Sequence, residues 1–390
     1  MFKNKNIILY LIYTLLSSIS FISPYTNLYL REKFGFSVSS IGLILIIYQI
    51  TKFIFEIPTG VIADKYGKKI SVIIGNILII FSYIILLLNM PILVYISFFL
   101  KGLGYTFISG SFEALFVNSL DNKYLVKLNS IERIFFYFGI GISSAIGGLI
   151  IDILDYNTII ILDTLIIIGI FIISLLVKET KEEINSEEKF LKSSISLILS
   201  KKFLICFLLL DLVTAISFIN IEDFYSTVLS NNGLNIKMIG VIIALQLFVS
   251  SLIGYIIHSF YKRLNKVKVY VIYSILQVIF ALCIYLQNSI FLMFTFYILS
   301  SICFSLFAPI KYEIFQANIN NEIRSTVLSI KSLTIAIGGV ISYFMVFLLG
   351  RYLTIEKITI ILLLITLISY IIINIILFKD MKAFYGNNNE

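Results

Sequence analysis

Long apolar runs recur along the whole chain and are separated by short breaks that contain charged residues, Gly, Asn or Pro. A helix needs about 20 mostly apolar residues to cross a bilayer, and most of the runs reach this length. The pattern therefore predicts an all-α membrane protein with about twelve transmembrane helices. The expected spans cover residues 7–30, 39–62, 70–89, 92–117, 126–150, 157–177, 203–226, 236–259, 267–287, 289–314, 323–349 and 355–378.

The composition supports lipid as the solvent of the outer face. Of the 390 residues, 59% are hydrophobic and 13% are charged, and the mean hydropathy is +1.01. A soluble domain carries about 25% charged residues, so a soluble fold could not cover its surface with so few. Because Trp is absent, the 24 Tyr would have to form the aromatic belt at the membrane interface.

The net charge of +8 could indicate nucleic-acid binding, but the positions of the charges favour a membrane protein instead. Most Lys and Arg lie in short loops between apolar runs, which is the pattern that sets membrane topology. They favour one side of the predicted spans by roughly four to one, and that side carries both termini and the central loop. We therefore expect no nucleic-acid partner, and an integral, multi-pass protein of the plasma (cytoplasmic) membrane with both termini in the cytoplasm.

Two other local features have ordinary explanations. The first apolar run follows basic residues, as in a signal peptide, but continues through Tyr29 without a small-residue cleavage site, so we expect it to be retained as the first span. The cysteines Cys206, Cys283 and Cys303 lie inside apolar runs and have no metal-ligand spacing, so no metal site is expected.

A single long polar stretch, which contains the sequence KETKEEINSEEK, divides the chain near its midpoint. We expect an N-terminal six-helix bundle at residues 1–177, a cytoplasmic linker loop at 178–202 and a C-terminal six-helix bundle at 203–390. Gly60 and the basic pair after it match the spacing around Gly254, and Glu113 similarly corresponds to Glu313. Such weak internal similarity is typical of transporters built from parallel repeats.

One motif lies in the loop after the second predicted span, on the basic side of the membrane. Its residues are Gly60, Asp64, Lys65, Gly67, Lys68 and Lys69, within the sequence EIPTGVIADKYGKK. They resemble the loop 2–3 signature of the major facilitator superfamily, G-x-x-x-D-[RK]-x-G-[RK]-[RK]. The motif, the number of spans, the midpoint loop and the repeat together extend the resemblance over nearly the whole chain.

Each position of this motif has a physical rationale. Gly60 would let helices pack closely, and Gly67 would permit a tight turn. Asp64 lies beside three lysines and could form ion pairs with neighbouring helices. The resemblance implies a gate that holds the cytoplasmic side in one conformation, and we hypothesise that a contact of Lys68 with Glu113 or Asp121 would complete it. Alternatively, the lysines only fix the topology.

The fifth predicted span carries an altered motif. Drug/proton antiporters of the superfamily often have G-x-x-x-G-P-x-x-G-G here, whereas this chain keeps Gly139, Gly147 and Gly148 but has Ser143 and Ser144 in place of Gly-Pro. The small residues still allow tight helix packing, while the proline bend is lost.

Ionisable residues inside spans are costly and usually face a cavity or a partner. Asp211 falls roughly nine residues into the seventh span, where an unpaired carboxylate would suit reversible protonation, and it is our first candidate for proton coupling. Glu56 is the second, although it lies one helical turn from Lys52 and the two could simply neutralise each other. Glu113 and Lys101 are further candidates. Other charges within the spans are Asp163, Lys311, Glu313 and Lys331.

The superfamily plan implies a substrate cavity lined by the first, fourth, seventh and tenth spans. The candidate cavity residues are Tyr25, Asn27, Tyr29, Lys52, Asn220 and Glu222. Because the chain has 34 Phe and 24 Tyr, we expect an aromatic, apolar cavity. Such a cavity suits hydrophobic or amphipathic solutes better than a sugar.

The resemblance implies a secondary transporter similar to bacterial drug-efflux members, whose halves rock around a midplane site. We expect a multidrug-type antiporter that exports a hydrophobic or amphipathic small molecule, driven by the proton gradient, and works as a monomer in the lipid bilayer. A proton symporter or facilitator that imports a metabolite is the alternative, and a membrane receptor without transport is a third. The sequence lacks hydrolase motifs, metal-type clusters and the nucleotide-binding loop G-x-x-x-x-G-K-[ST], so no enzyme, cofactor or use of ATP is expected.

Overall fold

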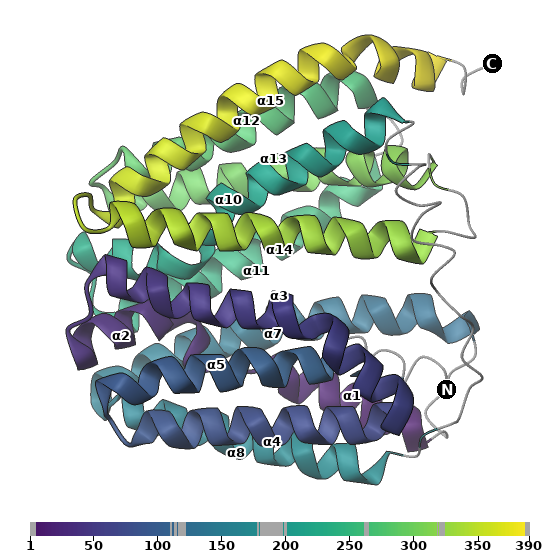
Figure 1. Ribbon diagram of the computed structural model, residues 1–390. Coiled ribbons are helices and arrows are strands. Elements are labelled where there is room, and N and C mark those ends of the chain that lie inside the picture. Colours follow the sequence, from purple (N-terminus) through teal and green to yellow (C-terminus); the bar gives the residue numbers. More distant parts are fainter. Residues whose placement is uncertain are drawn as a thin grey trace. The chain divides into compact units, whose positions relative to one another are not determined.

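The computed structural model describes residues 5–109, 111–112, 115, 122–177, 179, 198, 201–260, 265–317, 319 and 324–386. Within these ranges the regular structure is helical and contains no strand (Figure 1). The elements are α1 (Lys5–Ser17), η1 (Ser23–Tyr25), α2 (Thr26–Phe34), α3 (Val38–Tyr66), α4 (Lys68–Leu87), α5 (Pro91–Ile108), α7 (Asn122–Ile153), α8 (Tyr156–Leu176), α10 (Lys202–Asn231), α11 (Ile236–Phe260), α12 (Lys266–Tyr285), α13 (Ile290–Ala317), α14 (Arg324–Leu349) and α15 (Ile355–Gly386).

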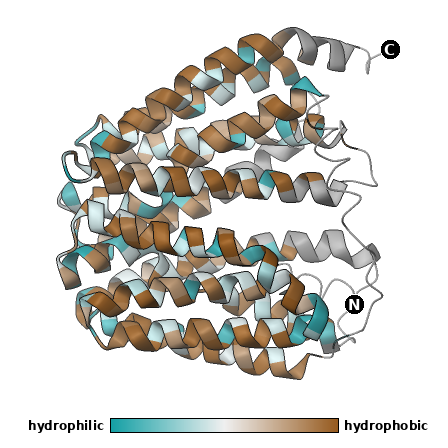
Figure 2. Cartoon of the chain, in the orientation of Figure 1, coloured by the Kyte–Doolittle hydropathy of each residue, from teal (hydrophilic) through white to brown (hydrophobic). Residues whose placement is uncertain are grey.

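Ten helical segments in the described part of the chain are long and apolar enough to cross a membrane. Asn6–Ser17 and Ile236–Ser250 are apolar but shorter. Figure 2 shows hydrophobic residues along most of the helix length and hydrophilic residues mainly at helix ends and connections. The prediction of an all-α, multi-pass membrane protein is confirmed, and most helix ends lie within a few residues of the expected ones.

The first predicted span departs from expectation. A continuous helix over residues 7–30 is wrong, because α1 ends at Ser17 and α2 begins at Thr26, with η1 between them. Regular helical hydrogen bonding stops in a segment rich in Ser, and Pro24 follows within η1. Non-helical backbone at membrane depth must find hydrogen-bond partners within the protein, and the partner of this segment is described below.

The chain divides into two compact units. Unit 1 contains Met1–Ile184 and Leu229–Phe248, and unit 2 contains Asn185–Val228 and Val249–Glu390. Helices α10 and α11 contribute residues to both units. The expected linker at 178–202 falls almost wholly outside the described residues, and the expected domain boundaries stay a prediction.

In unit 1, α4 packs against α5 and α8, and α5 also packs against α3 (Figure 1). Gly75 makes the α4–α5 contact close, because a Cβ atom there would lie only 2.6 Å from the backbone oxygen of Gly104. The Ser71 hydroxyl donates a hydrogen bond of 2.7 Å to the Phe107 backbone oxygen across the same interface. Small residues thus let the two helix backbones approach each other.

In unit 2, α12 packs against α13 and α15. Buried polar side chains link these helices: the amide of Asn374 donates to the Ser274 hydroxyl at 2.9 Å, and the Ser300 hydroxyl donates to the Gln277 backbone oxygen at 3.1 Å. In an apolar layer these hydrogen bonds hold neighbouring helices in register.

Candidate functional site

The loop between α3 and α4 is a one-residue turn at Gly67. Its φ angle is +109°, a conformation that disfavours side chains, so the prediction that Gly67 makes a tight turn is confirmed. Gly60 does not have its expected packing role, because a Cβ atom at this position would meet nothing within 4 Å.

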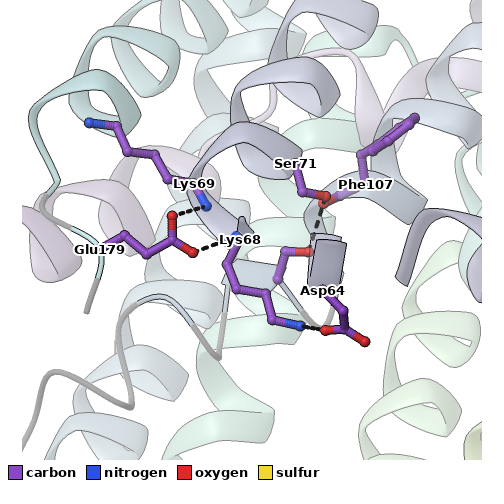
Figure 3. Close-up of polar contacts among 7 residues, drawn as sticks. Asp64, Lys68, Lys69, Ser71, Phe107 and Glu179 are labelled. Carbon is purple, nitrogen blue, oxygen red and sulfur yellow. Dashed lines mark hydrogen bonds and ion pairs between the residues drawn. The ribbon is translucent and has the colours of Figure 1, made fainter. Parts of the chain in front are cut away.

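A residue that the sequence did not single out caps the start of α4. The Glu179 carboxylate accepts hydrogen bonds from the backbone N–H groups of Lys68 at 2.5 Å and Lys69 at 3.4 Å (Figure 3). A Cβ atom on Gly67 would lie only 2.9 Å from this carboxylate, so a larger residue would collide with the cap as well as strain the turn. A carboxylate at a helix N-terminus satisfies free N–H groups and is favoured by the helix dipole.

The cap is reciprocal. Glu179 follows α8 and caps α4, while the ammonium group of Lys69 donates a hydrogen bond of 2.7 Å to the Leu175 backbone oxygen in the last turn of α8. A cation near a helix C-terminus is also favoured by the dipole. We name Lys68, Lys69, Leu175 and Glu179 the capping cluster; it ties the start of α4 to the end of α8.

The charged pair of the motif bridges the turn at Gly67. Lys68 of α4 forms an ion pair with Asp64 of α3, whose side chain is 48% exposed (Figure 3). Exposed pairs of this kind contribute little stability. Lys65 lies over the ring of Tyr66 at 5.3 Å. Glu113 and Asp121, the expected partners of Lys68, lie outside the described residues.

The broken first span is held by Asp163 of α8. The Asp163 carboxylate accepts hydrogen bonds from the Phe21 N–H at 2.8 Å, the Ile22 N–H at 3.0 Å and the Ser20 hydroxyl at 3.1 Å. The side chain is almost fully buried, and it satisfies backbone groups that the helix break leaves free. The sequence showed Asp163 only as a charge in a span; the serine-rich segment and Pro24 were the local signals of a break.

The glycines of the fifth-span motif, in α7, face the same broken segment. A Cβ atom on Gly147 would lie 2.9 Å from the Phe21 backbone oxygen, and one on Gly148 would lie 2.6 Å from the Tyr25 hydroxyl. Gly139 similarly approaches Ser18. The expectation that these glycines allow tight packing is therefore met in the structure.

The candidate cavity residues near the first span are buried. Tyr25, Asn27 and Tyr29 are each at most 1% exposed, and the Tyr25 hydroxyl donates to the Ser144 backbone oxygen at 2.6 Å. Their expected role in lining a cavity stays a prediction, since here they pack within unit 1.

The two candidate cavity residues of α10 differ in burial. Glu222 is exposed, whereas Asn220 is fully buried and its amide group has no hydrogen-bond partner among the described residues. Unsatisfied amides inside proteins are rare, so Asn220 stays a candidate for contact with a polar ligand group.

The charged residues of α3 and α5 have local partners. Glu56 accepts a hydrogen bond of 2.6 Å from the Ser109 hydroxyl. The Lys52 ammonium lies 5.4 Å from the ring centre of Tyr48, and that of Lys101 lies 5.1 Å from the ring centre of Tyr83. Their proposed roles in proton coupling remain predictions.

Asp211 is paired, and the expectation of an unpaired carboxylate is wrong. Lys311 of α13 lies 2.5 Å from one carboxylate oxygen of Asp211, and Lys331 of α14 lies 4.0 Å from the other. The three side chains are 13–26% exposed. We name them the Asp211 cluster. The sequence contained all three charges but could not show that three different helices bring them together.

Unit 2 also has an ion pair at its own basic loop. The ammonium of Lys266, at the start of α12, lies 2.7 Å from a carboxylate oxygen of Glu313 in α13. Charge pairing near the helix ends is therefore present in unit 2 as well, although the loop motif itself is confined to unit 1.

Within the residues that the structure describes, ten apolar helices of membrane-spanning length, with an ion pair inside them, define a polytopic membrane protein. The chain belongs to the Major Facilitator Superfamily, whose sequence profile matches residues 7–257. The predicted resemblance is confirmed. Because the members of this family are transporters, the prediction that the chain is not an enzyme is also confirmed.

Two relatives show the range of similarity. The uncharacterized MFS-type transporter YxaM of Bacillus subtilis is 25% identical over 254 residues, which make up 63% of this chain and 63% of that protein. The quinolone resistance protein NorB of Staphylococcus aureus is 28% identical over 165 residues, which make up 42% of this chain and 35% of that protein. The matched region spans less than two thirds of either relative.

Solved structures resemble the whole fold at low sequence identity. The nucleoside transporter NupG has a TM-score of 0.74 at 15% identity, with 94% of this chain and 97% of that chain covered. The POT family transporter PepTSo has a TM-score of 0.80 at 11% identity, with 97% and 98% covered. At these identities the likeness shows the fold alone.

Proposed function

We propose that the chain is a secondary transporter that exports a hydrophobic or amphipathic small molecule by alternating access, in exchange for protons. The observation that carries this proposal is the Asp211–Lys311 ion pair, which lies within membrane-spanning helices of a chain of this superfamily. Charged residues at membrane depth are retained mainly where they bind substrates, ions or protons. Asp211 can exchange its contact with Lys311 for a proton, and Lys311 can exchange its contact with Asp211 for a polar group of a solute.

The surroundings of the pair favour an amphipathic solute. The ring of Phe207 lies 6.0 Å from the Lys311 ammonium, and the buried rings of Tyr270 and Phe307 pack next to it in turn. If these helices part during transport, aromatic surroundings with few charges would suit a molecule that has an apolar body and one polar group. The similarity to NorB, which is named for quinolone resistance, supports drug efflux.

The capping cluster fits the proposed gate. It joins α4 to α8 through hydrogen bonds that involve charged groups, and such bonds are stronger than neutral ones. We propose that these bonds hold one conformation of unit 1 and loosen when the transporter changes conformation. The protein would act in the plasma membrane as a monomer, with both termini in the cytoplasm and without ATP.

One observation favours import by proton symport as a second candidate. Asp211 is paired with Lys311, a cation that could also pair with the negative group of an anionic solute. A solute that takes Lys311 would leave Asp211 without its partner, and the carboxylate would then bind a proton more readily. The solute and the proton would move in the same direction.

Transport into vesicles tests the proposal. Everted membrane vesicles that contain the full chain should accumulate amphipathic dyes when a proton gradient, acid inside, is imposed, and an uncoupler should abolish the accumulation. The Asp211→Asn variant should lose the gradient-dependent part. The matched control is Asp152→Asn, which removes an exposed carboxylate near the end of α7.

The outcomes separate the two candidates. Dye accumulation that is indifferent to uncouplers contradicts proton exchange. Accumulation only in right-side-out vesicles, driven by an inward proton gradient, supports the symporter instead. Because Asp211→Asn leaves two partly buried lysines without this carboxylate, the double variant Asp211→Asn with Lys311→Met serves as a second, charge-balanced test.

A further inference from the structure

One carboxylate in the membrane-spanning part of α10 has no counter-charge. Glu222 forms no hydrogen bond or ion pair with the residues that the structure describes, whereas the neighbouring Asp223 accepts a hydrogen bond from the Tyr343 hydroxyl of α14. Asp211, further along the same helix, is paired with lysine. The carboxylate of α10 that lacks a partner among the described residues is therefore Glu222 and not Asp211.

Glu222 lies within the apolar layer. The helix runs from Lys202 to Asn231, and Glu222 is between five and six residues past its middle, which corresponds to about 8 Å along the axis. The hydrocarbon core extends about 15 Å to either side of the bilayer centre. In a helix centred on the bilayer, Glu222 is thus at hydrocarbon depth, where an ionised carboxylate without a counter-charge is unfavourable.

Glu222 is nevertheless accessible. From Asp211 to Ser230 every residue is described, and Glu222 is the only exposed one. A helix that faces lipid exposes several large apolar side chains, as α15 does at Leu364 and Ile368. Because this stretch of α10 exposes none, the accessible surface of Glu222 is not part of a lipid-facing surface.

Glu222 lies on the face of α10 that carries Asp211. The two residues are eleven positions apart, which is about three helical turns, so their side chains leave the helix in nearly the same direction. At Asp211 this face meets Lys311 of α13 and Lys331 of α14. The two carboxylates are about 16 Å apart along α10, so a group bound at Glu222 does not need to displace the Asp211–Lys311 pair.

We propose that Glu222 binds the cationic group of the transported solute. An ammonium, pyridinium or similar cation supplies the counter-charge that the described residues do not. Phe218, one turn before Glu222 on the same face, is half-buried and can pack against an apolar part of the solute. The inference rests on the proposed function in that the ligand is the exported solute. It narrows that solute to an amphipathic cation, in contrast to the anion of the symport alternative.

Direct binding tests the inference independently of transport. The full chain in nanodiscs of phosphatidylcholine is dialysed to equilibrium against N-methyl-4-phenylpyridinium, a permanent cation, or against 4-phenylpyridine, which has the same rings and is uncharged in alkaline buffer. Empty nanodiscs give the lipid background. A contact between opposite charges predicts that the cation binds about tenfold more tightly. Glu222→Gln should remove this preference by weakening the cation alone, whereas Glu222→Asp should keep most of it. Asp152→Asn, which removes an exposed carboxylate of α7, is the matched control.

Four results would overturn the inference: equal binding of the two probes to the wild-type chain, an unchanged preference in Glu222→Gln, equal weakening of both probes by that variant, or the same loss of preference in Asp152→Asn. The third result would mean that Glu222 has only a structural role. The fourth would mean that the overall charge of the protein attracts the cation. Failure of the proposed function is a different outcome, because vesicles would then move no solute although the cation still binds with the expected preference. Gradient-driven export without any preference for the cation would refute the role of Glu222 alone.

Discussion

Replacement of Glu179 tests the capping cluster. In Glu179→Ala, the N–H groups of Lys68 and Lys69 lose their acceptor, and the start of α4 loses a negative charge. Glu179→Gln removes the charge but keeps an oxygen that can accept a hydrogen bond. The two variants therefore separate the hydrogen-bond contribution from the charge contribution.

The expected magnitude follows from the geometry. Loss of an N-terminal cap costs about 0.5–2 kcal/mol, and a charge near a helix terminus contributes about 0.3–1 kcal/mol. Because the Glu179 side chain is only half-buried, we expect about 1–2 kcal/mol for Glu179→Ala and about 0.3–1 kcal/mol for Glu179→Gln. A change of one or two kcal/mol alters a conformational equilibrium by a factor of about 5–30. Transport should therefore slow in the same order if the cluster holds one state.

A thiol-reactive dye can measure the unfolding of unit 1. Ser82 is fully buried in α4, so Ser82→Cys reports when this helix becomes accessible. The native thiols, Cys206, Cys283 and Cys303, are first replaced by Ser or Ala so that the dye reports only on α4.

The unfolding temperature should fall in the order wild type, Glu179→Gln, Glu179→Ala, with Asp152→Asn as a control for the loss of an exposed carboxylate. An Ala variant that unfolds at the wild-type temperature would refute the capping argument. So would a Gln variant that is less stable than the Ala variant.

Three further predictions concern stability. Gly75→Ala should destabilise unit 1 by about 1–3 kcal/mol because its Cβ would overlap the Gly104 backbone; the control Gly60→Ala should be neutral or slightly stabilising in the same thermal assay, and equal effects would contradict the packing argument. Asp163→Ala should destabilise the broken first span more than Asp163→Asn, which keeps one acceptor; proteolysis of that segment measures the difference, and equal cleavage would argue against the cap. Asp155 accepts hydrogen bonds from the Thr158 hydroxyl and N–H at the start of α8, and these bonds lower its pKa below the usual value. Its stabilising contribution is thus complete above about pH 4 and is lost as the pH falls through the lowered pKa, so Asp155→Ala should cost about 1 kcal/mol at pH 7 and less in acid; an effect independent of pH would contradict this assignment.

Much of the fold was predictable because the length of an apolar run is a local property. A span in lipid must be helical and about 20 residues long, so the runs fixed the helix positions within a few residues. The broken first span was the exception. The segment is apolar enough to resemble a helix, and the carboxylate of Asp163, supplied by α8, satisfies backbone groups that the break leaves free.

The candidate site was only partly predictable. The turn at Gly67 follows from the motif, because its conformation is set by its own backbone. The motif does not predict the group that caps the Lys68 N–H at the start of α4. That group belongs to Glu179, which lies 111 residues away in a run of similar charges. Nothing local distinguishes the glutamate that caps a helix from those that are solvated.

The sequence by itself thus determined that the protein spans a membrane, where most of its helices begin and end, the basic bias of its loops and its family. Only the tertiary structure decided which charges meet. Asp211 looked isolated along α10, yet Lys311, 100 residues away, pairs with it. The physical reason is that a charge in an apolar layer must find a partner, but any helix can supply one, and only packing selects it.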